Sequence, residues 1–293
     1  MMCSDVYNAK TMSIRRLAHV LDVPVSTVGR WTCGKSHKQQ SGSLRSCPIS
    51  QDELWRQRIK TFCDQPRHRT YGYRRITALL RRQGFGINRK TVWRIMHQMG
   101  LSRPKIRYKS ARPKHVEKMR PLAPNQGWQI DMTSFALSDL TAVYLMLVTD
   151  CYSRKIVGFN LDRRCTAGEW IGALRMALDH EGLTDKQVCR MLTVRSDNGA
   201  QPCSKRFVEF LGQRGVQGQY TGYNAPDDNA YVERVIRTVK EEEIWCNSYD
   251  TLFEARKAIE EYIQYYNHER IHSALDYRTP NEVAAAYNAL AVA

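Results

Sequence analysis

The order of apolar segments between residues 128 and 245 restricts the fold more than any other feature of this sequence. Three segments rich in branched and aromatic residues predict neighbouring strands: WQIDMTSF (128–135), VYLMLVTD (143–150) and KIVGFN (155–160). Helix-like and strand-like segments then alternate: a helix at 167–182, a strand at 191–197, a helix at 204–215, a strand at 216–220 and a long helix at 229–245. This order predicts a mixed α/β sheet flanked by helices.

Three acidic residues occupy unusual places in that pattern. Asp131 lies in the middle of the first predicted strand, Asp197 ends a later strand, and Glu233 lies one turn into the long helix. Burying an unpaired carboxylate costs several kcal/mol, so three clustered carboxylates need a compensating cation. Surface or turn positions are the alternative for each acid taken singly. Together they predict a catalytic site.

Oxygen ligands of this kind favour a hard divalent cation, Mg²⁺ or Mn²⁺. Two such ions, about 3.5–4 Å apart, activate the attacking oxygen and stabilise the leaving oxygen in phosphoryl transfer. We therefore expect Asp131, Asp197 and Glu233 to be both the catalytic residues and the ligands of two metal ions. Asp150 and Asp227 are nearby acids for which roles in turns are expected.

The long helix adds basic residues to the same face. Glu233, Arg237 and Lys240 are spaced four and three residues apart, so they lie on one side of a helix. Such a face suits both a metal ion and a DNA phosphate, with Arg237 and Lys240 as DNA contacts. A plain salt bridge between Glu233 and Arg237 is the alternative for that pair.

Basic charge is concentrated in the first part of the chain. Residues 1–120 hold 27 Lys and Arg against 6 Asp and Glu, whereas residues 121–293 hold 18 against 23. A basic arm joined to a mildly acidic domain indicates binding to a polyanion, and a surface that only favours solubility is the alternative.

Two segments of the basic arm are predicted to bind DNA. Residues 1–35 include SIRRLAHVLDVPVSTVGRWT (13–32), which predicts a helix-turn-helix, although any helical hairpin gives a similar pattern. Residues 51–102 predict a second helical unit, in which Asn88 caps a helix and Gly100 ends it. Its candidate DNA contacts are Arg74, Arg75, Arg89, Lys90 and Arg94, with a solvated helical face as the alternative.

The remaining segments complete the expected organisation. Residues 36–50 are predicted to be a polar linker and residues 103–124 a basic, proline-containing linker. Residues 125–248 form the predicted catalytic core and residues 249–293 a helical extension, in which TPNE (279–282) has the form of a capping box.

Several other classes of protein are disfavoured. The nine cysteines form no C-x-x-C pair, which argues against a disulfide framework or a structural zinc site, and His268 and His272 are expected to be packing or surface residues. GRWTCGKS (29–36) matches a phosphate-binding loop but lacks the preceding strand, so no nucleotide cofactor is expected. The longest apolar run, TAVYLMLV (141–148), is too short to cross a membrane.

Several blocks, in order, resemble the transposases of the bacterial IS-three insertion-sequence family, specifically their second-frame product. The resemblance covers residues 52–285 and is carried by YGYRRITALLRR, PNQGWQIDMTSF, YLMLVTDCYSRKIVGF, RSDNGAQ, PDDNAYVERVIRTVKEE and YIQYYNHERIHSALDYRTPNEV. The interval of thirty-five residues between Asp197 and Glu233 also fits.

The resemblance implies a ribonuclease H-like, retroviral-integrase-like core with Asp131, Asp197 and Glu233 as its three acids and Lys240 as a DNA contact. It implies a DDE transposase that cleaves DNA and transfers strands at terminal inverted repeats, as a homo-oligomer in the bacterial cytoplasm. A partner protein from an upstream frame is left open. A DNA-binding regulator with an inactive core and a structure-selective nuclease are the alternative functions.

Overall fold

The computed structural model describes residues 51–102, 119–183, 189–221 and 229–292. The predicted helix-turn-helix at 13–32, the linker at 36–50 and most of the basic linker lie outside the described residues. Gln51–Ala293 forms one compact unit. No helix within the described ranges combines the length and the apolar character that a membrane span requires.

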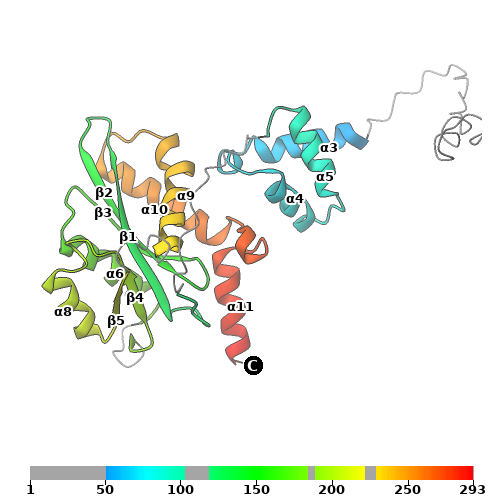
Figure 1. Cartoon of the computed structure of the whole chain (residues 1–293). Coiled ribbons are helices and arrows are strands. Elements are labelled where there is room, and N and C mark those ends of the chain that lie inside the picture. The colour runs from blue at the N-terminus through cyan, green and yellow to red at the C-terminus, as the bar shows by residue number, and fades with distance from the viewer. Residues whose placement is uncertain (1–50, 103–118, 184–188, 222–228, 293) are drawn as a thin grey trace, which may run out of the picture. The chain divides into compact units, whose positions relative to one another are not determined.

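A five-stranded mixed sheet forms the centre of this unit (Figure 1). Its strands are β1 (Gly127–Ala136), β2 (Ala142–Asp150), β3 (Ile156–Asp162), β4 (Thr193–Ser196) and β5 (Gln217–Tyr220). The strand order is β3-β2-β1-β4-β5; the first three strands in sequence are antiparallel, and β4 and β5 run parallel to β1. This is the ribonuclease H-like arrangement, and the predicted mixed α/β sheet is confirmed.

Helices cover both faces of the sheet. On one face, α6 (Ala167–His180) and α8 (Lys205–Arg214) share a core with side chains such as Trp128 and Ile130. On the other, α9 (Ala230–Glu242) and α10 (Leu252–His268) pack with side chains such as Leu145 and Leu147. Residues alternate between faces along a strand, so the odd-numbered positions of β1 point toward α9.

Local signals explain where these helices begin and how closely they pack. Thr166 and Glu169 form a capping box at the start of α6, and the Ser204 hydroxyl caps α8. Gly158 of β3 is required because a Cβ there would lie 2.5 Å from the Ala173 carbonyl oxygen of α6. The absence of a side chain therefore lets α6 approach the sheet.

The helical unit comprises α3 (Gln51–Cys63), α4 (Tyr73–Arg82) and α5 (Arg89–Gln98), with a 3₁₀ turn at Pro66–His68. The Asn88 side chain accepts a hydrogen bond from the Lys90 backbone N–H at 2.8 Å, and Gly100 has a positive φ of 69°, as the sequence predicted. Fully buried Ile271, from far along the chain, completes the apolar core of these helices.

The C-terminal region includes 3₁₀ turns at Ile244–Cys246 and Ser273–Leu275 and ends in α11 (Pro280–Val292). The predicted capping box is confirmed, since Thr279 and Glu282 exchange backbone-to-side-chain hydrogen bonds. The predicted helix at 229–245 is corrected, because α9 ends at Glu242. Negative charge is unfavourable at the C-terminal end of a helix, where Glu242 and Glu243 lie. Both carboxylates pair with arginines from outside α9: Glu242 with Arg270 and Glu243 with Arg67.

Candidate active site

Asp131 lies in the middle of β1, where its backbone is paired with Leu147 of β2. Its odd position directs the side chain to the α9 face of the sheet. The carboxylate accepts a hydrogen bond of 2.7 Å from the Met132 backbone N–H, and the residue is half-buried. A carboxylate is thus held in a rigid strand at the edge of an apolar core.

Gln129 fixes helix α9 against this strand. It lies two residues before Asp131 and is buried, with 1% of its surface exposed. Its side-chain oxygen accepts hydrogen bonds from the backbone N–H groups of Tyr231 at 3.0 Å and Val232 at 3.1 Å. These groups belong to the first turn of α9, where N–H donors lack helical partners. Gln129 therefore sets the position of the turn that carries Glu233.

The other two acids lie on the elements beside β1. Asp197 comes directly after β4, which pairs with β1, and its exposed carboxylate accepts a hydrogen bond of 3.1 Å from the Gly199 N–H. The sequence placed Asp197 at the end of the strand, and the strand in fact stops at Ser196. Glu233 is an exposed residue in the first turn of α9.

Electrostatics link the three acids. The pKa of Asp131 rises from 3.8 to about 6, first because burial disfavours its charged form and then because the charges of Asp197 and Glu233 repel it. The Met132 N–H and the Lys240 ammonium group act in the opposite direction. Asp197, Glu233 and Lys240 therefore lie close enough to Asp131 for their charges to act on its carboxylate.

The three carboxylates lie on neighbouring elements, but they are not close enough together to bind one metal ion in this arrangement. Across the described part of the chain, no three carboxylate, imidazole or thiol side chains are placed to hold a single metal ion. The three side chains suit a hard cation because all of them offer carboxylate oxygens. A bound cation would also stabilise the charged form of Asp131, which burial and the neighbouring carboxylates disfavour.

The basic residues predicted on α9 have distinct surroundings. Arg237 is exposed and its Nε donates to the Glu241 carboxylate at 2.7 Å, an i, i+4 ion pair one turn further along this helix. Lys240 is partly buried, and its ammonium group lies close enough to Asp131 to favour the charged form of that carboxylate. Among the other nearby acids, Asp150 is a turn residue, as predicted: it accepts hydrogen bonds from Ser153 and Asn125. Asp227 lies outside the described residues.

The candidate DNA contacts of the helical unit fall into two groups. Arg74, Arg89 and Lys90 are exposed, and Arg94 is exposed but paired with Asp52 at 2.9 Å. Arg75 points inward, with 20% of its side chain exposed, and lies 3.7 Å from the Glu242 carboxylate. The unit therefore presents Arg74, Arg89 and Lys90 most openly.

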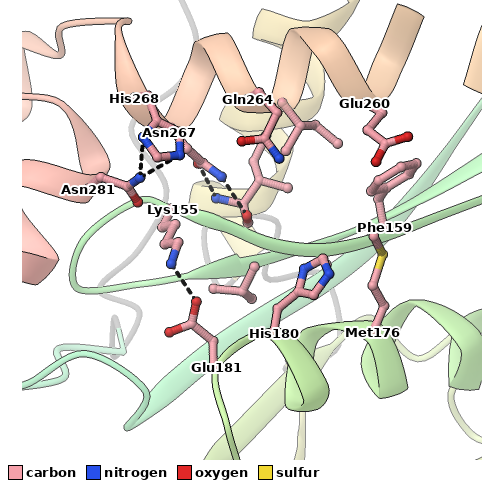
Figure 2. A pocket seen from close by; sticks show the side chains of 14 residues that line it. Lys155, Phe159, Met176, His180, Glu181, Glu260, Gln264, Asn267, His268 and Asn281 are labelled. Atoms are coloured by element: carbon pink, nitrogen blue, oxygen red, sulfur yellow. Dashed lines mark hydrogen bonds and ion pairs between the residues drawn. The ribbon is translucent and has the colours of Figure 1, made fainter. Parts of the chain in front are cut away.

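A separate cavity of about 370 Å³ lies at the outer edge of β3 (Figure 2). Lys155 and Glu181 form an ion pair of 2.6 Å in it, and the Asn267 side chain both accepts from the Ile156 N–H and donates to the Ile156 carbonyl, each at 2.9 Å. His268 lies against Asn281 at 2.9 Å. None of the three candidate acids lines this cavity, so its polar groups serve the packing of α10 and α11 on the sheet.

Sequence reasoning missed Gln129, although a signal was present. In WQIDM, polar residues at 129 and 131 alternate with apolar neighbours, so both had to face the same side of the sheet. It also missed the inward role of Arg75, for which no local signal exists.

Comparison with known proteins gives matches over most of the chain. Residues 50–110 match an HTH-like domain, and residues 121–225 and 214–280 match integrase core domains. The chain is 33% identical over 242 residues to the transposase for insertion sequence element IS904 of Lactococcus lactis, which covers 78% of this chain and 93% of that protein. It is 30% identical over 222 residues to the putative transposase InsK for insertion sequence element IS150 of Escherichia coli K12, covering 72% and 76%.

Among solved structures, the catalytic core domain of HTLV-2 integrase in complex with magnesium matches 56% of this chain and 99% of its own length, with 20% identity and a TM-score of 0.44. The sheet order and the matched domains define a ribonuclease H-like, integrase-type catalytic core preceded by an HTH-like domain. The chain belongs to the insertion-sequence transposases of the IS-three family.

Proposed function

We propose that this protein is a DDE transposase that cleaves DNA at the ends of an insertion sequence and joins them to a target. The observation that carries the proposal is the placement of three acids on neighbouring elements of an integrase-type core: Asp131 on β1, Asp197 directly after β4, and Glu233 in the turn of α9 that Gln129 holds against β1. The relatives that cover most of the chain are transposases of insertion sequences, which supports the same activity.

Asp131, Asp197 and Glu233 are the proposed catalytic residues and the ligands of divalent metal, Mg²⁺ or Mn²⁺, with two ions expected. Bound metal would lower the pKa of the attacking hydroxyl or water and stabilise charge on the phosphate. Gln129 holds the first turn of α9, which carries Glu233, against the strand that carries Asp131. Because the carboxylates are not closed around one point in this arrangement, a further approach of the three groups would accompany binding of metal and DNA.

In this reaction water attacks the phosphorus atom and the 3′ oxygen of the DNA leaves, taking up a proton as the 3′-hydroxyl. That hydroxyl then attacks a phosphodiester of the target, and the displaced oxygen leaves in turn. Lys240, which lies beside Asp131, and Arg237 would hold the DNA backbone at the site.

Double-stranded DNA, as terminal repeats and as target, is the proposed partner, and Arg74, Arg89, Lys90 and Arg94 of the HTH-like domain are its proposed contacts. Arg75 is proposed to support this DNA-binding surface indirectly, through its contact with Glu242. A homo-oligomer brings two ends together in the bacterial cytoplasm, with or without an upstream-frame protein.

The test uses Asp197→Asn, which changes a charge with almost no change in shape. Purified variant and wild-type protein would be given Mg²⁺ or Mn²⁺ and DNA carrying both element ends. We expect the variant to bind this DNA as wild type does and to lose cleavage and joining by at least a thousandfold. Asp179→Asn, on the exposed end of α6, is the matched control.

The outcomes separate the candidate functions. Wild-type cleavage by Asp197→Asn would refute the assignment of the site. A wild-type protein that binds the ends but neither cuts nor joins them would be a regulator. Cleavage of branched or hybrid substrates without any strand joining would identify a structure-selective nuclease.

A further inference from the structure

A second, cation-rich cavity lies beside the proposed active site. Its volume is about 200 Å³, and four arginines from separate elements line it: Arg75 of α4, Arg154 of the β2–β3 turn, Arg234 of α9 and Arg270 after α10. Four guanidinium groups around one small cavity repel one another unless anions lie between them.

Among the described residues, one carboxylate pairs with two of these arginines. Arg270, with 3% of its side chain exposed, forms a two-pronged pair with Glu242, from Nε at 2.8 Å and from Nη2 at 2.7 Å. Arg75 lies 3.7 Å from the same carboxylate. These contacts make Arg75, Arg270 and Glu242 a structural cluster that fixes the end of α9.

The other two arginines differ from these in the part of the chain that the structure describes. Within the described ranges, Arg154 and Arg234 form no ion pair, and no carboxylate lines the cavity. The Arg154 guanidinium lies 3.4 Å from the centre of the Tyr231 ring, and its Nη1 is buried without a hydrogen-bond acceptor. A buried guanidinium N–H group is stabilised by an acceptor oxygen, and an anionic oxygen suits it best.

The positive charge of the four arginines also affects His272, which lines the cavity. The pKa of this histidine falls to about 2, first because it is buried and then because Arg270, Arg75, Arg154 and Arg234 all disfavour a further positive charge. This positive charge points to an anionic ligand.

We propose that this cavity binds one phosphodiester group of the DNA, with Arg154 and Arg234 as its ligands. Guanidinium groups match phosphate oxygens with paired donors, and a single phosphate group fits the cavity. Arg234 directly follows Glu233 in α9, so a phosphate held there lies near the proposed scissile bond. The inference rests on the proposed function and adds a DNA-positioning site to it.

The test measures DNA binding by the full-length chain without metal, so it does not depend on cleavage. A fluorescent duplex of about 30 base pairs would be titrated at several KCl concentrations. Loss of one phosphate contact should reduce the slope of log K against log [KCl] by about 1 and weaken binding about tenfold near 0.1 M salt. We expect this for Arg234→Gln and for Arg154→Gln, with little further loss when both are replaced, because they share one phosphate.

Arg206→Gln, an exposed arginine of α8 on the opposite face of the sheet, is the matched control and should leave the slope unchanged. Arg154 also stacks on Tyr231, so thermal unfolding is followed for each variant. Exposed Arg234 has no such packing role and keeps the test informative if Arg154→Gln misfolds.

Inorganic phosphate, added at constant ionic strength, provides a second arm. Inorganic phosphate could stabilise wild type but not the variants while the slope of log K against log [KCl] for DNA is the same in all of them. That result would assign the cavity to a free anion and overturn the DNA proposal. Unchanged slopes without any phosphate effect would also overturn it, because neither arginine would then contact a phosphate of the DNA. Slopes reduced as expected in both variants, in a protein whose wild type never cleaves DNA, would support this site and refute the proposed activity.

Discussion

Replacing Asp131 with asparagine should stabilise the metal-free protein while it removes activity. Asparagine has nearly the same shape and can still accept the hydrogen bond from the Met132 N–H. It differs in being neutral at every pH, whereas the Asp131 carboxylate must ionise in a half-buried place beside Asp197 and Glu233. The substitution therefore removes the repulsion and keeps the packing.

The size and the sign of the effect follow from the pKa. A rise from 3.8 to about 6 corresponds to about 3 kcal/mol at about 1.4 kcal/mol per tenfold change in proton affinity, and partial exposure of Asp131 reduces our expectation to about 1–2 kcal/mol. Since the folded-state pKa is raised, wild type is unaffected below pH 4, loses stability as the pH rises from about 4 to about 6, and stays at that lower stability above pH 6. The variant has no such loss.

Thermal unfolding in EDTA between pH 4 and 8 measures the difference. Asp131→Asn should melt with wild type at pH 4 and about 2–8 °C above it at pH 7.5, because about 1 kcal/mol shifts the melting temperature of a domain this size by about 2–4 °C. Mg²⁺ should stabilise wild type more than the variant. Exposed Asp179→Asn should show no pH-dependent difference. Equal melting of Asp131→Asn and wild type at pH 7.5 would refute the argument.

Three further substitutions test how the site is supported. Gln129→Leu removes the acceptor of two buried N–H groups and should lower the free energy of unfolding by about 1–3 kcal/mol in urea titrations, and cleavage more than tenfold; normal cleavage would remove its positioning role. Gly158→Ala should cost about 1–3 kcal/mol because its Cβ meets the backbone of α6 at 2.5 Å, whereas Gly212→Ala, with open space around it, should cost nothing. Glu242→Gln strips the counterion from buried Arg270 and should cost about 3–5 kcal/mol; a loss in thermal stability equivalent to less than 1 kcal/mol would show that the pair is dispensable.

Much of the fold was predictable because its signals are local. Short segments rich in apolar, branched and aromatic residues predicted all five strands, and the cap at Asn88 and the stop at Gly100 needed only neighbouring residues. The acid at position 131 was conspicuous because polar side chains are rare in the middle of an apolar strand.

The parts that escaped prediction depend on distant residues meeting. Gln129 caps α9 only because β1 and α9, a hundred residues apart, pack together. The end of α9 depends on Arg270, whose contact with Glu242 spans 28 residues, and the cavity around Arg154 needs four separate elements. No pattern within a short window carries such information.

The contact between Asn267 and Ile156 also limits how copies of this protein can assemble. An edge strand normally offers its free backbone groups to a strand from another molecule. Here the amide of a helical side chain already occupies both backbone groups of Ile156, and the Arg256 guanidinium donates to the Leu161 carbonyl. Growth of a continuous sheet from one subunit into the next is therefore disfavoured along β3, which leaves this edge of the sheet to contacts made by side chains.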